Sequence, residues 1–332
     1  MAALKIGIIG TARIARSFCA GVRNSQKVVV TAIASRAQAS ADAFAKEFGL
    51  AKAYASYQAL LADPQIDAIY NPLPNALHAP WSIRAAEAGK HVLCEKPLGP
   101  TFADVIAIQA SAKRHGVHIV EAYPYLAQPQ TQLLRQLVRD GAIGRLRAIQ
   151  ALFTFPLRDW SDIRTDPALG AGALLDVGCY PISLARVLAG ARATRVSAVA
   201  DFTETGVDRT LVATLEYADG LLAQISCSFA AANMRYALIL GDQGAIETNY
   251  WNHTNPERPA ELRIKRSPGP EAVFETISTT QINGFLSEAE SFADLVAGGA
   301  WTGATALESL DIAAVLDAAA ASARAGAPVD LA

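Results

Sequence analysis

Short apolar runs alternate with amphipathic stretches through the first third of the chain. The runs predict strands and the stretches predict helices, with glycine or proline at the joins. Strand–helix alternation of this kind implies a parallel sheet with helices on both faces. The expected strands are 5–9, 28–34, 68–71, 91–94 and 118–120. The expected helices are 12–23, 40–48, 57–62, 79–88 and 101–114.

Beyond Glu121 the pattern changes to longer strand candidates. Ala218-Asp219-Gly220 is a hairpin signal, and hairpins imply an antiparallel sheet. Strands are expected at 147–155, 195–202, 210–217, 221–228, 236–240, 245–248 and 262–265, and helices at 131–139, 181–188, 285–296 and 305–324. The sequence therefore predicts an α/β protein of two domains, residues 1–121 with the parallel sheet and residues 122–332 with an α+β arrangement.

Composition limits the classes of protein to consider. Apolar residues make up 52% of the 332 residues and charged residues 18%, which permits a large core. No apolar run approaches the ~20 residues of a membrane span. The formal net charge of −2 argues against general affinity for nucleic acid or anionic membranes. We therefore expect neither a nucleic-acid nor a membrane partner.

The start of the chain and its cysteines and histidines bear on compartment and metal. Residues 1–7 enter a strand with no charged region, apolar core and cleavage site before it, so a cytoplasmic location is expected. The 4 cysteines are widely spaced and fit reduced thiols. The 5 histidines are scattered, and no Cys/His cluster has zinc-ligand spacing, so no metal site is predicted.

A dinucleotide fingerprint follows the first strand. Residues 10–15 read Gly-Thr-Ala-Arg-Ile-Ala, in which Gly10 allows a tight turn and Ala12 lets the backbone approach a pyrophosphate. The N-terminus of the helix that begins here supplies free N–H donors. The alternative is an ordinary strand–helix turn. We predict a cofactor-binding loop made by Gly10, Thr11, Ala12, Arg13 and Ile14.

The end of the second strand bears on the choice of cofactor. An NAD site usually places Asp or Glu here for the ribose 2′-hydroxyl, whereas this chain reads Ser35-Arg36. Arginine pairs well with a 2′-phosphate, so NADP is favoured and NAD stays possible. The alternative for Arg36 is a solvated surface arginine.

The third strand leads into a stiff loop, Pro72-Leu73-Pro74-Asn75. At the carboxyl end of a strand, such a loop is expected to wall the nicotinamide and its ribose. The alternative for Asn75 is a helix cap.

Glu95-Lys96-Pro97 ends the fourth expected strand. A lysine held beside an apolar sheet can be partly desolvated, which suits it to proton chemistry. The alternative is a surface Glu-Lys pair, worth under ~1 kcal/mol. The sequence alone thus makes Lys96 a candidate catalytic group.

These pieces together resemble the glucose–fructose oxidoreductase/inositol dehydrogenase (Gfo/Idh/MocA) family over nearly the whole chain. The carriers of the resemblance are the fingerprint at 10–15, Pro72-Leu73-Pro74-Asn75 with His78, Glu95-Lys96-Pro97, Glu121-Ala122-Tyr123 and the run from Leu169 to Pro181. The Asp-x-Gly-x-Tyr form at 176–180 looks like the branch that holds dimeric dihydrodiol dehydrogenase and NADP-dependent xylose dehydrogenase. The family implies an N-terminal Rossmann domain and a C-terminal domain with a large, open, mainly antiparallel sheet.

The resemblance also implies roles for particular residues. The family's lysine matches Lys96 and its acid/base tyrosine matches Tyr180. Asp176 is expected to bind substrate or orient Lys96, with a helix cap or a structural ion pair as the alternative. Arg164 matches a family arginine near the cofactor, and the cofactor set is completed by Pro72, Leu73, Asn75, His78, Glu95 and Lys96. Glu95 either fixes the turn or contacts the nicotinamide ribose.

The match also carries one structural expectation and a departure at two positions. On the resemblance we predict a cis bond between Lys96 and Pro97. Relatives often carry arginine and histidine where this chain has Leu126 and Gln128, so the substrate is expected to be chosen partly there.

The resulting hypothesis is an NADP-dependent oxidoreductase that acts on a sugar, a polyol or a related vicinal diol. Tyr180 would act as acid or base with help from Lys96. Two rivals are a non-catalytic NADP(H)-binding regulator and an enzyme that uses the cofactor transiently without net redox change. The wide sheet should have a face that needs a partner, so a homodimer or a dimer of dimers is expected.

Overall fold

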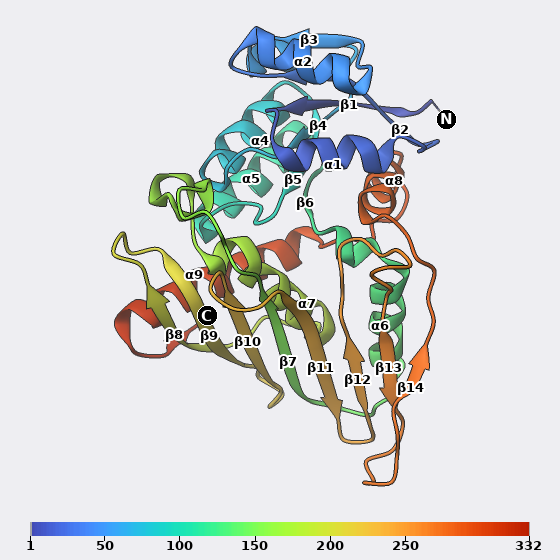
Figure 1. Cartoon of the computed structure of the whole chain (residues 1–332), viewed down its shortest axis with the longest axis vertical. Helices are drawn as coiled ribbons and strands as arrows, with labels where there is room; N and C mark the ends of the chain where they lie inside the picture. Colours follow the sequence, from blue (N-terminus) through green and yellow to red (C-terminus); the bar gives the residue numbers. More distant parts are fainter. Residues whose placement is uncertain (1, 332) are drawn as a thin grey trace. The chain divides into compact units, whose positions relative to one another are not determined.

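The computed structural model describes residues 2–331, which form two compact units (Figure 1). The first unit runs to Ala127 and also contains Asn283–Ala306, and the second contains Gln128–Ile282 and the residues from Leu307 onward. This division differs from the predicted boundary at 121/122 in two ways. It falls six residues later, and a segment from near the end of the chain belongs to the first unit.

A parallel six-stranded sheet in the order β3-β2-β1-β4-β5-β6 forms the centre of the first unit. Its strands are β1 (Leu4–Ile9), β2 (Val28–Ala34), β3 (Lys52–Tyr54), β4 (Ala68–Asn71), β5 (His91–Glu95) and β6 (Ile119–Ala122). Its helices are α1 (Arg13–Val22), α2 (Gln38–Phe48), α3 (Tyr57–Leu61), α4 (His78–Glu87), α5 (Phe102–His115) and α8 (Gly284–Val296). Short 3-10 turns lie at Asn75–Leu77 and Pro124–Ala127. The predicted Rossmann-type sheet is confirmed, and β3 is the strand that the apolar pattern missed.

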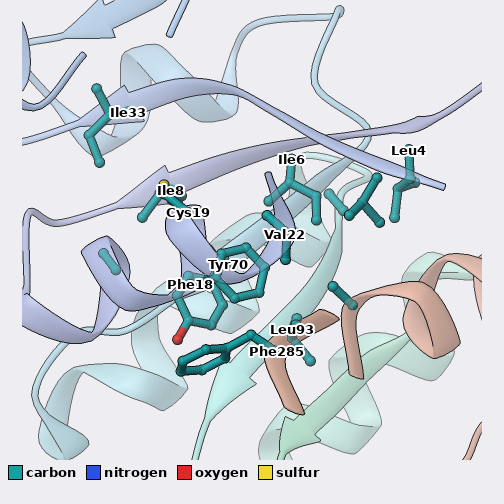
Figure 2. Close-up of a cluster of buried hydrophobic side chains, with 14 of the residues drawn as sticks. Leu4, Ile6, Ile8, Phe18, Cys19, Val22, Ile33, Tyr70, Leu93 and Phe285 are labelled. Atoms are coloured by element: carbon teal, nitrogen blue, oxygen red, sulfur yellow. The ribbon is translucent and has the colours of Figure 1, made fainter. Parts of the chain in front are cut away.

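The core of this unit explains why α8 belongs to it. Phe18 of α1 stacks on Tyr70 of β4 with ring centroids 4.0 Å apart, and Phe285 of α8 meets Phe18 edge-on at 5.8 Å. Figure 2 shows these three rings together beneath the apolar side chains of β1. Phe285 is 2% exposed, so its burial ties α8 to the first sheet.

A nine-stranded sheet in the order β14-β13-β12-β11-β7-β10-β9-β8-β15 forms the second unit. Its strands are β7 (Leu146–Thr154), β8 (Arg195–Phe202), β9 (Asp208–Glu216), β10 (Leu222–Ser228), β11 (Met234–Gly241), β12 (Ala245–Thr248), β13 (Leu262–Lys265), β14 (Glu275–Ile277) and β15 (Val329–Asp330). Its helices are α6 (Pro129–Arg139), α7 (Cys179–Ala189) and α9 (Ala306–Ala325). Only the β7–β10 pair is parallel among the described strands of this sheet, so the large, mainly antiparallel sheet is confirmed.

The two faces of the nine-stranded sheet differ in exposure. One face packs under helices such as α7, which lies against β7 and β10. On the other face Val199 and Val212 are register partners, and they are 77% and 43% exposed. Leu222 and Met234 on β10 and β11 are also about half exposed. This open face thus exposes four apolar side chains, with polar residues such as Thr214, Gln224 and Ser226 between them.

One segment of the second unit, Pro167–Ala189, is long and apolar enough by length and composition to cross a membrane. Of its most apolar window, 67% is buried inside the protein. A mostly buried core helix passes the same test, and α7 is such a helix. Among residues 2–331, no group of three or more His, Cys, Asp or Glu side chains is arranged to hold a metal ion.

Candidate active site

The predicted nucleotide loop joins β1 to α1. Gly10 has φ 93°, and its N–H donates to the carbonyl of Ala34 at 2.8 Å. A Cβ at Gly10 would lie 2.8 Å from Leu73 Cδ2, so a larger residue would close the turn. No described side chain caps α1 at Ala12, and the first turn carries no acidic residue. Its N–H groups are therefore oriented to bind an anion such as a pyrophosphate.

The rest of this loop suits the same ligand. Thr11, Ala12 and Ile14 are partly exposed and Arg13 is exposed, so all four remain accessible. The carbonyl of Thr11 accepts a hydrogen bond from Arg16 Nη1 of α1 at 2.9 Å, and this bond restrains the loop. The structure thus brings together the five residues predicted from the fingerprint.

Ser35 and Arg36 lie at the same sheet edge as Gly10. Gly10 follows Ile9 and Ser35 follows Ala34, and Ile9 and Ala34 are register partners. The Ser35 N–H donates to the Tyr54 carbonyl at 3.0 Å, while the Arg36 side chain is exposed. Burial raises the pKa of Tyr57, and the nearby Arg36 charge opposes that rise. The Tyr57 hydroxyl lies 3.7 Å from the Cβ position of Gly10, so Arg36 is close to the fingerprint turn.

The proline-rich loop after β4 is held by His78. One ring nitrogen of His78 contacts the Leu73 carbonyl and the other the Pro97 carbonyl, both at 2.7 Å. Burial lowers the pKa of His78 to about 4, so the imidazole is neutral. Its side chain is 1% exposed. His78 thus joins two loops at the strand ends. Its cofactor contact stays a prediction.

The remaining predicted residues of this loop divide by exposure. Pro72 and Leu73 are buried, and Leu73 packs against Gly10. Asn75 is partly exposed at the start of the 3-10 turn. The Asn71 side-chain amide donates to the His78 carbonyl at 3.2 Å and to Ser82 Oγ at 3.1 Å. The loop is thus rigid, as its prolines predicted, and it borders the fingerprint turn.

The Lys96–Pro97 bond is cis, which confirms the prediction for this turn. The Leu98 N–H after it donates to Glu121 Oε1 at 2.9 Å. Glu95 Oε1 accepts from the Tyr70 hydroxyl at 2.6 Å, and the Glu95 side chain is buried. Glu95 therefore fixes the turn from inside, which is the first of its two predicted roles. Lys96 is the partly exposed member of the pair.

Helix α8 brings a second carboxyl group toward Glu95. Glu288 is 1% exposed, and neither of its carboxyl oxygens has a hydrogen-bond partner among the described residues. Burial raises the pKa of Glu288 well above its usual value, and the Glu95 charge adds to the rise. Burial thus favours the uncharged form of the Glu288 carboxyl group. Nothing in the sequence announces that Glu288 lies near Glu95, because the two residues belong to different predicted domains.

In the second unit, one turn of π-helix at Leu174–Gly178 runs directly into α7. Pro181 lies in the first turn of α7, where a missing N–H is tolerated. The segment is anchored by Asp208 of β9, which accepts from the Leu174 N–H at 2.6 Å. Burial raises the pKa of Asp208 to about 6. Asp176 and Tyr180 are thus carried on one continuous helical segment.

Asp176 forms an ion pair with Arg164, whose Nε lies 2.8 Å from Asp176 Oδ2. This carboxylate raises the pKa of the Arg164 guanidinium, and Asp162 at 3.1 Å adds to the effect. The structural ion pair that we considered for Asp176 is therefore present. Arg164 and Asp176 are both partly exposed, so the pair stays accessible to a ligand.

Tyr180 is 5% exposed and its hydroxyl accepts from Asn252 Nδ2 at 2.9 Å. Phe153 of β7 meets the ring edge-on at 5.3 Å, and the Arg235 guanidinium lies 4.2 Å from the ring centroid. Arg235 and Asn252 were missed by the sequence analysis. An arginine at an inward position of an apolar strand was the available signal, since Ala237 and Ile239 share its alternation.

Leu126 and Gln128 are both fully buried, with 0% exposure. The Gln128 side-chain amide donates to the Asn252 carbonyl at 2.6 Å and to the Ile282 carbonyl at 3.0 Å. The expectation that substrate is chosen partly at these two positions stays a prediction. Gln128 fixes the backbone of Asn252, and through it the hydrogen bond to Tyr180.

Comparison with known proteins agrees with these observations. The model of an oxidoreductase family with an NAD-binding Rossmann fold matches residues 4–123, and the Gfo/Idh/MocA C-terminal domain matches residues 131–247. The chain is 37% identical to D-xylose 1-dehydrogenase (NADP(+)) 2 from Haloferax volcanii over 99% of this chain and 100% of the relative. It is 35% identical to mouse (Mus musculus) trans-1,2-dihydrobenzene-1,2-diol dehydrogenase over 74% of each chain.

A solved structure adds a relative with bound cofactor. The 3-ketoreductase from Actinomadura kijaniata, in complex with NADP and TDP-benzene, superposes with a TM-score of 0.87 and 31% identity over 98% of each chain. Fold, fingerprint and full-length similarity thus agree. This chain belongs to the Gfo/Idh/MocA family of oxidoreductases.

Proposed function

We propose that this protein is an NADP-dependent oxidoreductase that transfers hydride between the nicotinamide and a CH–OH or C=O group of a sugar, a polyol or a vicinal diol. The observation that carries the proposal is the uncapped start of α1 above Gly10, with Arg36 at the same sheet edge. Relatives named as an NADP-dependent xylose dehydrogenase and as a diol dehydrogenase support the substrate class.

The chain's own residues divide the work of binding. The first turn of α1 and the Gly10 turn would hold the pyrophosphate, and Arg36 would pair with a 2′-phosphate. The loop at Pro72–Asn75 would border the nicotinamide and its ribose. When bound, the nicotinamide supplies or accepts the hydride. The protein must then supply orientation and a proton.

Tyr180 is proposed to move that proton at its hydroxyl. An unperturbed phenol with a pKa of ~10 is a poor base at neutral pH, so it needs help from neighbouring groups. Lys96 is proposed either to stabilise the phenolate or to protonate the carbonyl oxygen directly. The Asp176–Arg164 pair is proposed to bind polar groups of the substrate or cofactor.

The test of this function is a substrate panel with both cofactors. Aldoses, ketoses, inositols, anhydro-sugars and diols are incubated with NADP and with NAD, and the nicotinamide absorbance band and the organic products are both followed. Reduction of NADP by a sugar or diol is the expected result. Product formation without a change in the absorbance band would favour transient use of the cofactor. No turnover on the whole panel, with tight NADPH binding, would favour the binding regulator.

Replacing Arg36 by glutamine is expected to raise KM for NADP about 10- to 100-fold, because a charge-assisted contact to phosphate is lost. KM for NAD should change little, since NAD has no 2′-phosphate. Steady-state kinetics with each cofactor measure both values. Arg23→Gln, at the exposed far end of α1, is the matched control. Equal increases for the two cofactors would contradict 2′-phosphate recognition by Arg36.

We also propose that two copies pair through the open face of the nine-stranded sheet. The face carries Val199, Val212, Leu222 and Met234, each at least 43% exposed. Burying these apolar side chains against a second copy would stabilise a dimer. Static light scattering should give at least twice the mass of one chain, and the mass of a single chain at all concentrations would exclude the pairing.

A further inference from the structure

Arg235 is a buried cation enclosed by aromatic rings. It is 2% exposed, and its guanidinium carbon lies 4.2 Å from the Tyr180 ring centroid, 4.6 Å from that of Tyr250 and 4.7 Å from that of Phe153. Phe153 is its register partner on β7, so the arginine points to the helix-covered face of the sheet. Burying a guanidinium costs free energy that aromatic faces offset only in part. Packing alone therefore does not explain this residue.

The two tyrosines beside Arg235 have hydroxyl groups with opposite hydrogen bonds. The Tyr250 hydroxyl donates to the Leu152 carbonyl at 2.9 Å, which requires the neutral phenol. The Tyr180 hydroxyl accepts from Asn252 Nδ2 at 2.9 Å, a bond that becomes stronger when the phenol loses its proton. Arg235 also makes a side-chain hydrogen bond to Tyr250. The bond from Asn252 to Tyr180 is one that a phenolate can keep, whereas the bond from Tyr250 to Leu152 is not.

The position of Asn252 is fixed from a second direction. The Asn252 carbonyl accepts from Gln128, which is fully buried and also donates to the Ile282 carbonyl. This bond restrains the backbone from which the Asn252 amide reaches Tyr180. The hydrogen bond to the phenol oxygen is thus part of a fixed arrangement within the second unit.

Among the described residues, Arg235 has its guanidinium against the Tyr180 ring, and other ionisable groups lie nearby. On the helical segment of Tyr180, Asp176 is paired with Arg164 at 2.8 Å. From β9, Asp208 accepts the Leu174 N–H at the start of that segment. On the loop after β12, burial first and then the Arg235 and Arg258 charges lower the pKa of His253 to about 4, so it is neutral. Burial raises the pKa of Tyr250, although the Arg235 charge opposes this.

We propose that Arg235 and Asn252 are positioning residues that stabilise the phenolate form of Tyr180 from within the second unit. The proposal rests on the proposed acid/base role of Tyr180. A cation against the ring face lowers the energy of the phenolate more than that of the phenol, because the charge of the phenolate spreads over the ring. An amide N–H to the phenolate oxygen adds to that preference. Part of the assistance expected from Lys96 is thereby assigned to the unit that carries the tyrosine.

The test is a spectrophotometric pH titration of the full-length protein, which follows the near-ultraviolet absorbance of tyrosinate. Subtracting the titration of Tyr180→Phe isolates the Tyr180 step from the other tyrosines, of which Tyr54, Tyr57, Tyr217, Tyr236 and Tyr250 have pKa values raised mainly by burial. In Arg235→Met, the Tyr180 step should move up by about one pH unit, a tenfold change in the ionisation constant. Arg235→Lys keeps the charge and should restore most of the shift.

Asn252→Asp is the second variant. Its carboxylate would accept a hydrogen bond from the Tyr180 hydroxyl and so favour the protonated phenol. The Tyr180 step should again move to higher pH, without any change at Arg235. The pH at which kcat is half-maximal in the oxidation direction should move in the same sense for both variants. An unchanged Tyr180 step in Arg235→Met would overturn the proposal, even if activity fell, since a merely structural arginine would lower kcat without moving the titration.

The titration also separates this proposal from the proposed function. Full turnover in Tyr180→Phe would refute the acid/base role of Tyr180, whereas the absorbance step would still report whether Arg235 controls its ionisation. Conversely, an inactive Tyr180→Phe with an unmoved step in Arg235→Met would keep the function and remove Arg235 from it. Each result therefore bears on one claim alone.

Discussion

Replacing Tyr180 by phenylalanine is expected to lower kcat about 10²- to 10⁴-fold, the usual contribution of a positioned acid or base. The change removes one oxygen atom and keeps the ring that Phe153 and Arg235 contact. The helix should therefore keep its place, and NADPH binding should stay within a few-fold of wild type. Steady-state kinetics on the best substrate of the panel, with fluorescence titration of NADPH, measure both quantities.

Two further variants define what the Tyr180 result means. Tyr236→Phe removes a hydroxyl from the opposite face of β11 and should leave kcat unchanged. Lys96→Met should lower kcat by orders of magnitude with NADPH binding largely intact, because the lysine lies at the carboxyl end of β5. Near-normal turnover in Tyr180→Phe or in Lys96→Met would refute the proton role of that residue.

Replacing Phe285 by alanine is expected to reduce the free energy of unfolding of the first unit by about 3–5 kcal/mol. The ring is 2% exposed and meets Phe18 edge-on at 5.8 Å, within a cluster that includes Tyr70. Its loss leaves a cavity where α8 joins the sheet, and the cavity cost adds to the lost burial. Chemical denaturation, followed by circular dichroism, measures the change.

Leu286→Ala is the matched control for Phe285, because this neighbour on α8 is only partly buried. It should cost clearly less than Phe285→Ala. If Phe285→Ala reduced the free energy of unfolding by less than about 1 kcal/mol, the effect would be no larger than that of a typical surface substitution. That result would show that α8 is not anchored to this core.

The sequence predicted most elements of the fold because burial leaves a local pattern. Strands covered on both faces read as continuous apolar runs, as β4 does, and the hairpin signal before β10 gave the second sheet its antiparallel character. The missed strands β3, β14 and β15 have two or three residues, too few for any periodicity. Periodicity predicted α8 as a helix, but it carries no information on which sheet the helix packs against.

Some site residues could be predicted from local sequence patterns, whereas others come together only in the folded chain. The fingerprint turn and the spacing of Asp176 and Tyr180 are local, and the structure brings each set together. The Arg164–Asp176 pair joins residues twelve positions apart through two short turns that no pattern announces. The neighbours of Tyr180 depend on the register of β7 and β11, which places Arg235 opposite Phe153. Such neighbours follow from the assembled sheet.

Hydride transfer between NADP and a carbinol carbon is the central claim. A substrate labelled with deuterium tests it most directly. The protein is incubated with NADP and the best sugar or diol of the panel, labelled with deuterium at the carbon that is oxidised, and the reduced nicotinamide is analysed by mass spectrometry. One deuterium in each NADPH formed, with a matching amount of carbonyl product, is the predicted result. Unlabelled NADPH beside an oxidised product, or product without NADPH, would contradict the claim.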